Sequence, residues 1–585
     1  MVAILQRVTI LTVKGDGMVI RRQSREDIRR TIAERLSWQT AQRDNPRVAR
    51  AVYEGAEVDA IYNLDEAGLL DEFYHFLEMI GFLSLVQGMQ LPGVERVLIP
   101  VVQFILLYLL KTLLGIESMN SLPPLLFSNV ALMTLIGFSA YQVANGLTQR
   151  GDDRRQKKDK QGPLTAQCLA QNISKFSCAQ MEKFFNSVVR LLMVGLGLVR
   201  GEITVALDGT KLRTTEKYAG RGCLKVEHEV KEKGTGRWVK VVEFIFGWKL
   251  LVLIEVRTRL PLAAKVLKIE GYEGEWLVPL VQQAQANLGG KARIVKVMVD
   301  RGYLDGEDLW ELDQMGIIFV VIAKSGMAVR EDAQALAKEG DVVERVREVR
   351  HGHGGKATVE KVKTRLVGIE ELTTYDDYGT VEHSKQKNRK SFVGNPLNAV
   401  VILTWENHEY GERGAVYLTN GPVADPFVVF DDYDRRSVIE NGTFKEGKNP
   451  WKLEHFPQKT EEAVIVHCFF TLVVMALSTA FRLWQASEAE EEGVGEGAVE
   501  KAKGDALALL GGGRLEASLL GGEGTERWRR RLKQENRDKV IVFVGEHYGI
   551  FHVAEMATLS GVRIKSIPQK LGSRETILAY YGLKP

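Results

Sequence analysis

EITVALD, residues 202–208, and ARIVKVMVD, residues 292–300, are the two stretches that decide the fold. Each is a run of apolar and β-branched residues that ends in an aspartate, a pattern typical of a buried strand. Taken singly, Asp208 or Asp300 is better explained as a turn residue, and Asp208-Gly209 is a common turn dipeptide. Two such aspartates on neighbouring strands reverse that preference, because burying a carboxylate costs on the order of several kcal/mol. We therefore expect both at a sheet edge that opens into a cleft or holds a cation.

The sequence around these stretches predicts an alternating series of strands and helices. Further apolar runs at 238–256, 262–269 and 317–322 indicate strands, and 274–288 and 305–315 have helical spacing. Three strands, a helix, a strand, a helix and a strand is the order of a ribonuclease-H-like core. We predict an α/β fold with a ribonuclease-H-like mixed sheet and flanking helices, interrupted by a β-rich insertion.

Shifts in composition predict the domain boundaries. A helical N-terminal region precedes the core, and a small C-terminal domain follows it. The expected parts are an Arg-rich region (1–62), a helical and possibly DNA-binding domain (63–200), a catalytic domain in two pieces (201–325 and 431–485), a β-rich insertion (326–430), a Gly- and Glu-rich flexible linker (486–525) and a C-terminal helical domain (526–585).

Charge is balanced overall but unevenly distributed. The 585 residues contain 78 Lys plus Arg and 75 Asp plus Glu. Basic clusters at 21–35, 150–160 and 385–390 would suit phosphate contacts, although a solvated surface explains any one of them about as well. The four cysteines form no CxxC pair, as in a reduced cytoplasmic protein.

Two apolar stretches have to be weighed as membrane spans. Residues 98–114 contain Lys111 and are barely long enough to cross a bilayer, and residues 463–484 contain His467 and Arg482. We expect both to be core helices of a protein without a membrane partner.

A third carboxylate comes from the segment DDYDRRSVIENGTFKEGK, residues 431–448. Tyr433, Arg436 and Glu440 are spaced i, i+3, i+7, so one helical face presents all three. By itself this pattern equally fits an exposed Arg436–Glu440 ion pair. With Asp208 and Asp300, however, Glu440 would complete an all-oxygen site for hard cations such as Mg²⁺.

At this point the sequence resembles the DDE insertion-sequence transposases, whose catalytic helix has a Y-x2-R-x3-E-x6-K signature. VALDGTKL (205–212) resembles their first aspartate strand, VMVDRGYLDGEDLWEL (297–312) their second, and YLTN (417–420) the lead-in to YDRRSVIENGTFKEGK (433–448). The resemblance covers roughly residues 100 to 484, with three motifs in the same order.

The resemblance implies a site and its cofactors. Asp208, Asp300 and Glu440 would be catalytic and would bind two divalent ions, Mg²⁺ or Mn²⁺. Tyr433 and Arg436 would contact DNA near the cut site. The family's lysine belongs where this chain has Gly447, so Lys445 and Lys448 are the candidates. On an ideal helix Lys448 is turned about 80° from Glu440, unless Asn441-Gly442 loosens the helix.

The resemblance also implies partners. These are double-stranded DNA, as the terminal inverted repeats of an element and as target DNA, and a second copy of the chain on paired ends. The protein would act in the cytoplasm, on the nucleoid. Two alternatives stay open: a stand-alone ribonuclease-H-like nuclease, and an inactive DNA-binding regulator of transposition. In the tail, residues 553–572 resemble a helix-turn-helix or a plain helical hairpin.

Overall fold

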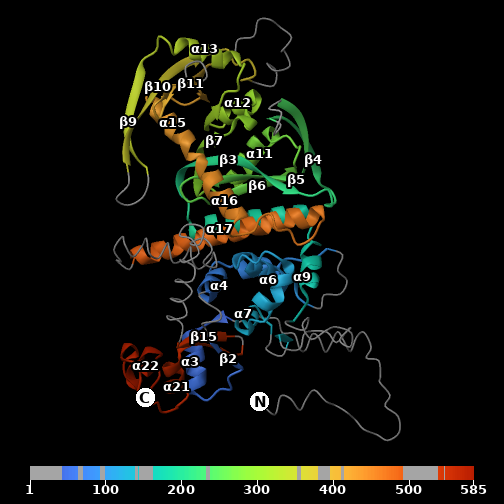
Figure 1. Cartoon of the computed structure of the whole chain (residues 1–585). Coiled ribbons are helices and arrows are strands. Elements are labelled where there is room, and N and C mark those ends of the chain that lie inside the picture. Colours follow the sequence, from blue (N-terminus) through green and yellow to red (C-terminus); the bar gives the residue numbers. More distant parts are fainter. Residues whose placement is uncertain are drawn as a thin grey trace, which may run out of the picture.

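The protein combines a large mixed sheet, a layer of helices and a small unit built from both ends of the described chain (Figure 1). The mixed α/β architecture predicted from the sequence is confirmed. The computed structural model describes residues 42–63, 70–92, 99–138, 142–143, 163–231, 238–351, 358–379, 395–409, 414–491, 538–545, 547–564 and 566–584. The three basic clusters and nearly all of the expected flexible linker lie outside these residues.

Eleven strands form the central sheet, in the order β4-β5-β3-β7-β8-β13-β11-β10-β9, with β6 on β5 and β12 on β11. Strands β3, β7 and β8 run parallel, and β5 is antiparallel to both β3 and β6. The strands are β3 (Gly201–Thr214), β4 (Gly222–Lys231), β5 (Trp238–Glu255), β6 (Pro261–Lys268), β7 (Ala292–Val299), β8 (Ile318–Ile322), β9 (Val342–His351), β10 (Thr358–Leu372), β11 (Leu397–Trp405), β12 (His408–Glu409) and β13 (Val416–Thr419).

Two helices connect the parallel strands. Helix α11 (Leu277–Asn287) joins β6 to β7, and α12 (Gly306–Gln314) joins β7 to β8. The Asp305 side chain accepts the N–H groups of Glu307 and Asp308, which fixes where α12 begins. Short capped connections of this kind hold the ends of the parallel strands in place.

The strand-rich segment 326–430 continues the central sheet. Strand β13 pairs with β8, and β11, β10 and β9 follow outward from it. The segment was predicted to be rich in β-structure, and it is. Its strands extend the sheet of the core, and α13 (Ala328–Leu336) packs against them.

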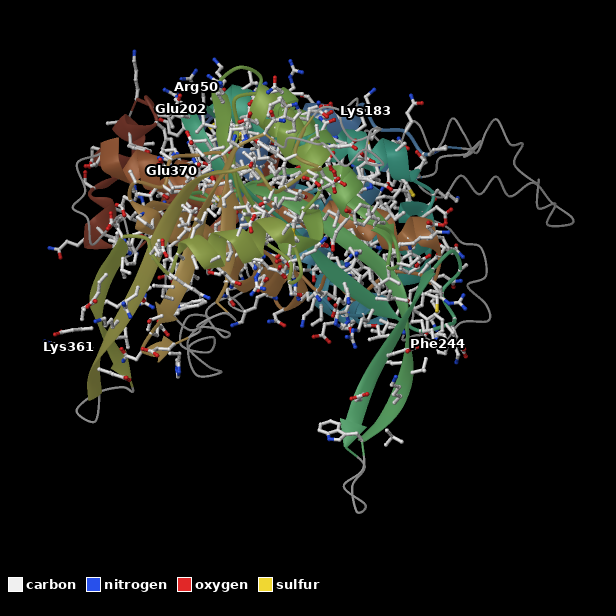
Figure 2. All side chains as sticks on the ribbon, turned by 90° about the horizontal axis from the view of Figure 1, so that it is seen from above. Arg50, Lys183, Glu202, Phe244, Lys361 and Glu370 are labelled. Atoms are coloured by element: carbon white, nitrogen blue, oxygen red, sulfur yellow. The ribbon has the colours of Figure 1, made fainter. Side chains whose placement is uncertain are left out.

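Two β-ribbons project from opposite ends of this sheet. Figure 2 shows one, formed by β4 and β5, with Phe244 labelled, and the other, formed by β9 and β10, with Lys361 labelled. On β5 the side chains of Trp238, Val242 and Phe244 are exposed. The ribbons therefore extend well beyond the packed core.

Helix α17 (Glu461–Glu491) lies between the sheet and the N-terminal helices (Figure 1). It packs against α6, α10 and β6. Residues Glu461–Phe481 are long and apolar enough to span a membrane, but the apolar 18-residue window within them is wholly buried inside the protein. The N-terminal helices are α4 (Leu70–Met79), α5 (Phe82–Gln87), α6 (Val101–Leu113), α7 (Val130–Leu135), α9 (Ala166–Ile173) and α10 (Cys178–Leu191).

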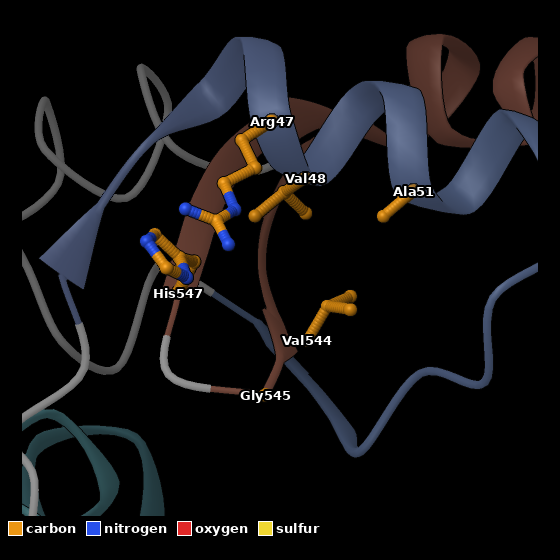
Figure 3. A pocket seen from close by; sticks show the side chains of 6 residues that line it. All are labelled: Arg47, Val48, Ala51, Val544, Gly545 and His547. Carbon is orange, nitrogen blue, oxygen red and sulfur yellow. The ribbon is translucent and has the colours of Figure 1, made fainter.

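Segments from both ends of the described chain share a second, four-stranded sheet, β1-β15-β14-β2. Its strands are β1 (Gln42–Arg43), β2 (Ala60–Asn63), β14 (Lys539–Val544) and β15 (His547–His552), and α3 (Asn45–Tyr53) packs on it. A pocket of about 320 Å³ lies between α3 and the β14–β15 turn, lined by Arg47, Val48 and His547 among others (Figure 3).

The C-terminal segment was predicted to be helical, and it contains both strands and helices. Helix α21 (Val553–Leu559) follows β15, and Gly561 turns the chain with a φ of +74°. The second helix of a helix-turn-helix would come next, but in the described stretches 562–564 and 566–573 only the short 3-10 turn Gln569–Leu571 forms before α22 (Arg574–Tyr580). The helix-turn-helix interpretation of residues 553–572 is therefore wrong.

Candidate active site

The register of β3 and β7 brings two of the three predicted carboxylates together. Leu207 pairs with Val299 on the neighbouring parallel strand, so Asp208 and Asp300 follow at adjacent positions. Asp300 comes after the last residue of β7, as predicted. Asp208 does not end its strand: β3 continues to Thr214, because the long strand β5 keeps pairing with it. Asp208 therefore lies where β3 loses its partner β7.

Glu440 comes from a helical segment that lies across β3. This segment consists of α15 (Pro426–Arg435), the π-helix η11 (Ile439–Phe444) and α16 (Lys445–Lys448). The Asp425 side chain accepts the N–H of Phe427, and Pro426 occupies the first turn, so α15 begins before the segment 431–448 in which the sequence suggested a helix. Glu440 lies in the π-helix, an element that occurs often at functional sites.

One guanidinium connects Asp208 with Glu440. Arg436 Nη1 donates to Asp208 Oδ2 at 2.7 Å, and Nη2 donates to Glu440 Oε1 at 3.2 Å. The other carboxylate oxygen of Asp208, Oδ1, accepts the N–H of Gly209 at 2.7 Å. The Arg436 and Asp208 side chains are 13% and 12% exposed, whereas Glu440 is 55% exposed. The i,i+4 ion pair considered from the sequence is thus present, and it extends to a strand aspartate.

The electrostatics place Asp300 in the same group. The pKa of Asp208 is raised to about 6, mainly by burial and also by the charges of Glu440 and Asp300, against the lowering effects of Arg436 and the Gly209 N–H. Burial also acts on Arg436, but Tyr433, Asp208, Asp300 and Glu440 together raise its pKa. Three carboxylates and one arginine therefore form one coupled cluster.

Tyr433 lies beneath this cluster and is largely buried. Its ring stacks on Tyr417 of β13, with centroids 4.5 Å apart, and the Arg436 guanidinium lies over the ring, 5.4 Å from its centroid. Burial raises the pKa of Tyr433 to about 12. In this structure the ring supports Arg436 from below, and little of it is accessible to a ligand.

The two candidate lysines differ in their surroundings. Lys448 Nζ donates to the backbone oxygen of Lys211 on β3 at 3.0 Å and pairs with Glu454 at 2.9 Å. Lys445 is exposed, and Gly447, at the position of the family's lysine, is buried. The π-helix spans Asn441-Gly442, where the sequence suggested a loosened helix. Its wider turn accommodates an extra residue between Glu440 and Lys448, and Lys448 reaches the strand of Asp208.

The carboxylates have the donor chemistry of a hard-cation site. Asp208, Asp300 and Glu440 offer only oxygen ligands, which Mg²⁺ and Mn²⁺ prefer. Within the described residues, no three His, Cys, Asp or Glu side chains are already arranged to hold a metal ion. The Arg436 guanidinium, a cation, bridges two of the carboxylates. By type and charge, these residues fit a divalent cation. In this structure Arg436 lies between Asp208 and Glu440 and contacts both.

Two supporting contacts were missed at the sequence level. Lys296 of β7 forms an ion pair with Asp432 of α15. Glu273 lies against two glycines next to the site: an added Cβ at Gly209 or Gly302 would lie 2.8 Å from one of its carboxylate oxygens. The Asp208-Gly209 and Arg301-Gly302 dipeptides are the only sequence signal of this close packing.

Comparison with known proteins gives a match to one family. A family model described as "Transposase DDE domain" matches residues 200–477. No curated protein matches the chain. Among solved structures, the chain is similar to the piggyBac transposase in a cryo-EM structure of its synaptic complex with hairpin DNA, with a TM-score of 0.35 and 10% identity over 84% of each chain. The segment that contains Asp208, Asp300 and Glu440, a little under half of the chain, thus matches the Transposase DDE domain family.

Proposed function

We propose that this protein is a DNA transposase that cuts the ends of an insertion sequence and joins the freed 3′-hydroxyl to target DNA. The observation that carries the proposal is the cluster of Asp208, Asp300 and Glu440 where the pairing of β3 with β7 ends, inside the matched segment. Such a cluster concentrates negative charge at a sheet edge, where phosphodiester chemistry requires cations.

The proposed scaffold is a ribonuclease-H-like core. The strand order β6-β5-β3-β7-β8, with only β5 antiparallel to the rest, supports it. The segment 326–430 would be an insertion in this core, because it separates β8 from the helical segment with Glu440.

In the proposed mechanism, Asp208, Asp300 and Glu440 hold two divalent ions, Mg²⁺ or Mn²⁺, which supply Lewis acidity for hydrolysis at the element end and for strand transfer. The chain's own residues fix the geometry. The β3–β7 register sets the distance between the two aspartates, and the π-helix presents Glu440 from the other side. Arg436, Tyr433, Lys445 and Lys448 would position the phosphates of the DNA.

The proposed partners are double-stranded DNA and a second copy of the chain. The DNA would include the terminal inverted repeats of the element and the target. A homodimer follows from the reaction, because two ends of one element have to be held together. Lys448, exposed Lys445 and Arg436 are described basic residues next to the carboxylates.

The test removes the charge of each carboxylate in turn. Asp208→Asn, Asp300→Asn and Glu440→Gln are each expected to abolish cleavage of an element-end duplex while binding to that duplex persists. Asp434→Asn is the matched control, because it removes an exposed carboxylate from α15 and should leave cleavage unchanged. A substitution at any of the three positions that still cuts at the wild-type rate refutes the role of that residue.

The products separate the proposal from its alternatives. Joined products on a target plasmid support a transposase, and cleavage without joining supports a nuclease. If duplex binding occurs without cleavage under any divalent ion, the protein is a regulator instead.

A further inference from the structure

Arg436 occupies the middle of the acidic cluster. Its two terminal nitrogens bond to Asp208 and Glu440, and its charge also interacts with Asp300. An arginine keeps its charge at any pH at which a protein is folded. In this state a single positive charge thus interacts with all three carboxylates and offsets one of their negative charges.

Arg435, the neighbouring arginine, does not point toward the carboxylate cluster as Arg436 does. Arg435 is 63% exposed and approaches Asp432 at 3.4 Å. An arginine that served only to contact DNA would be expected to extend into solvent in the same way. Arg436 instead is turned inward, over the ring of Tyr433.

Both oxygens of Asp208 and one oxygen of Glu440 already accept hydrogen bonds in this state. Asp208 Oδ2 accepts from Arg436, and Asp208 Oδ1 accepts from Gly209. A Mg²⁺ or Mn²⁺ ion would need carboxylate oxygens at about 2.1 Å, and a guanidinium bonded to the same carboxylates would repel it.

We propose that Arg436 closes the cation site in the DNA-free protein and must leave Asp208 and Glu440 before a divalent cation binds between them. This inference rests on the proposed function, because it takes these carboxylates as cation ligands.

DNA provides the displaced guanidinium with a new partner. Arginine binds phosphate through two parallel hydrogen bonds, as it binds a carboxylate. Binding of DNA and binding of the cation are therefore coupled through Arg436. By thermodynamic linkage, each strengthens the other by the same factor. The consequence is a protein that holds its metal ions weakly until DNA is in place.

The experiment measures Mn²⁺ binding to the full-length protein by electron paramagnetic resonance, with and without a short duplex of the DNA that flanks the gene. Wild-type protein is expected to bind Mn²⁺ at least tenfold more tightly with the duplex. Arg436→Met should bind Mn²⁺ at least tenfold more tightly than wild type without the duplex, and the duplex should add little. Arg435→Met removes the same charge one residue earlier and should behave as wild type.

A second variant and a second measurement distinguish a change in Mn²⁺ binding from misfolding. Arg436→Gln should show the same gain in Mn²⁺ affinity. Both Arg436 variants should melt at a lower temperature than wild type without metal, because the carboxylates lose their counter-ion, and Mn²⁺ should restore the melting temperature.

Two outcomes overturn the inference, and they are distinguishable. If Asp208→Asn abolishes Mn²⁺ binding but Arg436→Met binds no more tightly than Arg435→Met, Arg436 does not close the site and the proposed function stands. If wild type with duplex binds no more Mn²⁺ than Asp208→Asn does, the carboxylates are not cation ligands, and both proposals fail.

Discussion

Lys296 of β7 and Asp432 of α15 form an ion pair across 136 residues of sequence. The Asp432 side chain is 8% exposed. Lys296 belongs to the strand that ends before Asp300, and Asp432 lies one turn before Arg436. This pair joins the two pieces of the sequence that supply the acidic cluster.

Lys296→Met is expected to destabilise the protein by about 3 kcal/mol, because the buried Asp432 carboxylate keeps only the exposed Arg435, at 3.4 Å, as a counter-ion. Chemical denaturation measures this loss. Cleavage should also fall, since the helical segment with Glu440 loses an anchor on β7. The double variant Lys296→Met/Asp432→Leu removes both charges and should recover most of the stability. If the double variant is as unstable as the single one, the ion pair is not the cause.

Lys111→Met is expected to stabilise the protein. Lys111 is 1% exposed in α6, and within the described residues its Nζ makes no hydrogen bond. Burial lowers the pKa of Lys111 to about 8. Below pH 8 the folded protein therefore contains a buried positive charge, which destabilises it. At neutral pH the free energy of unfolding of the variant should be about 3 kcal/mol higher than that of wild type. As pH rises from 8 to 10.5, wild-type Lys111 loses its proton in the folded state first, and the gain should shrink. A gain independent of pH would contradict this account.

His467 should lower the stability of the protein as the pH falls below 6.5. Burial and the nearby charge of Lys111 lower its pKa to about 3. Its Nδ1 accepts from the Tyr108 hydroxyl at 2.8 Å, and its Nε2 donates to the Lys452 oxygen at 2.9 Å, which fits the neutral ring. The unfolded chain takes up the proton near pH 6.5 and the folded chain does not. The contribution to stability is therefore present above pH 6.5 and is lost below it, by about 1.4 kcal/mol per pH unit.

The measurement is the difference between wild type and His467→Gln in the free energy of unfolding, followed from pH 7 to pH 4.5. The difference should change steadily below pH 6.5. A constant difference over this range would show that His467 takes up a proton in the folded state.

Two glycines should respond in opposite ways to alanine. A Cβ at Gly442, in the π-helix, would meet only Arg259 atoms at 3.5 Å or more. Gly442→Ala is therefore expected to stabilise by about 0.5–1 kcal/mol, through helix propensity. A Cβ at Gly306, the first residue of α12, would lie 2.3 Å from the backbone of Asp377. Gly306→Ala should destabilise by about 1–3 kcal/mol. Thermal melting of both variants checks this contrast.

Apolar runs predicted most of the central sheet. Strands β3, β5, β6, β7 and β8 and helices α11 and α12 appear where the residues favour them, because each buries a continuous apolar face. Strand β4 was not counted in the predicted core order, although residues 227–229 were expected on an exposed strand. Its residues alternate between charged and apolar side chains, and hydrogen bonds to β5 hold it in a ribbon that is largely exposed. No burial pattern marks such a strand.

Sequence spacing located the three carboxylates but not the cation between them. The contact of Arg436 with Asp208 joins residues 228 positions apart, and helical periodicity informs only on the partner at i+4. The π-helix was also beyond periodicity, since the angular argument about Lys448 assumed a regular α-helix. The terminal sheet was missed because the partners of β14 and β15 lie near the other end of the chain.

The place of α17 has a consequence for synthesis. The N-terminal helices α6 and α10 pack against it, yet it follows the whole central sheet in sequence. A growing chain therefore releases those helices from the ribosome with their apolar sides uncovered, and they stay so until residue 481 has been made. A truncated product that lacked α17 would expose this surface permanently, and it would be recognised by chaperones and proteases as unfinished.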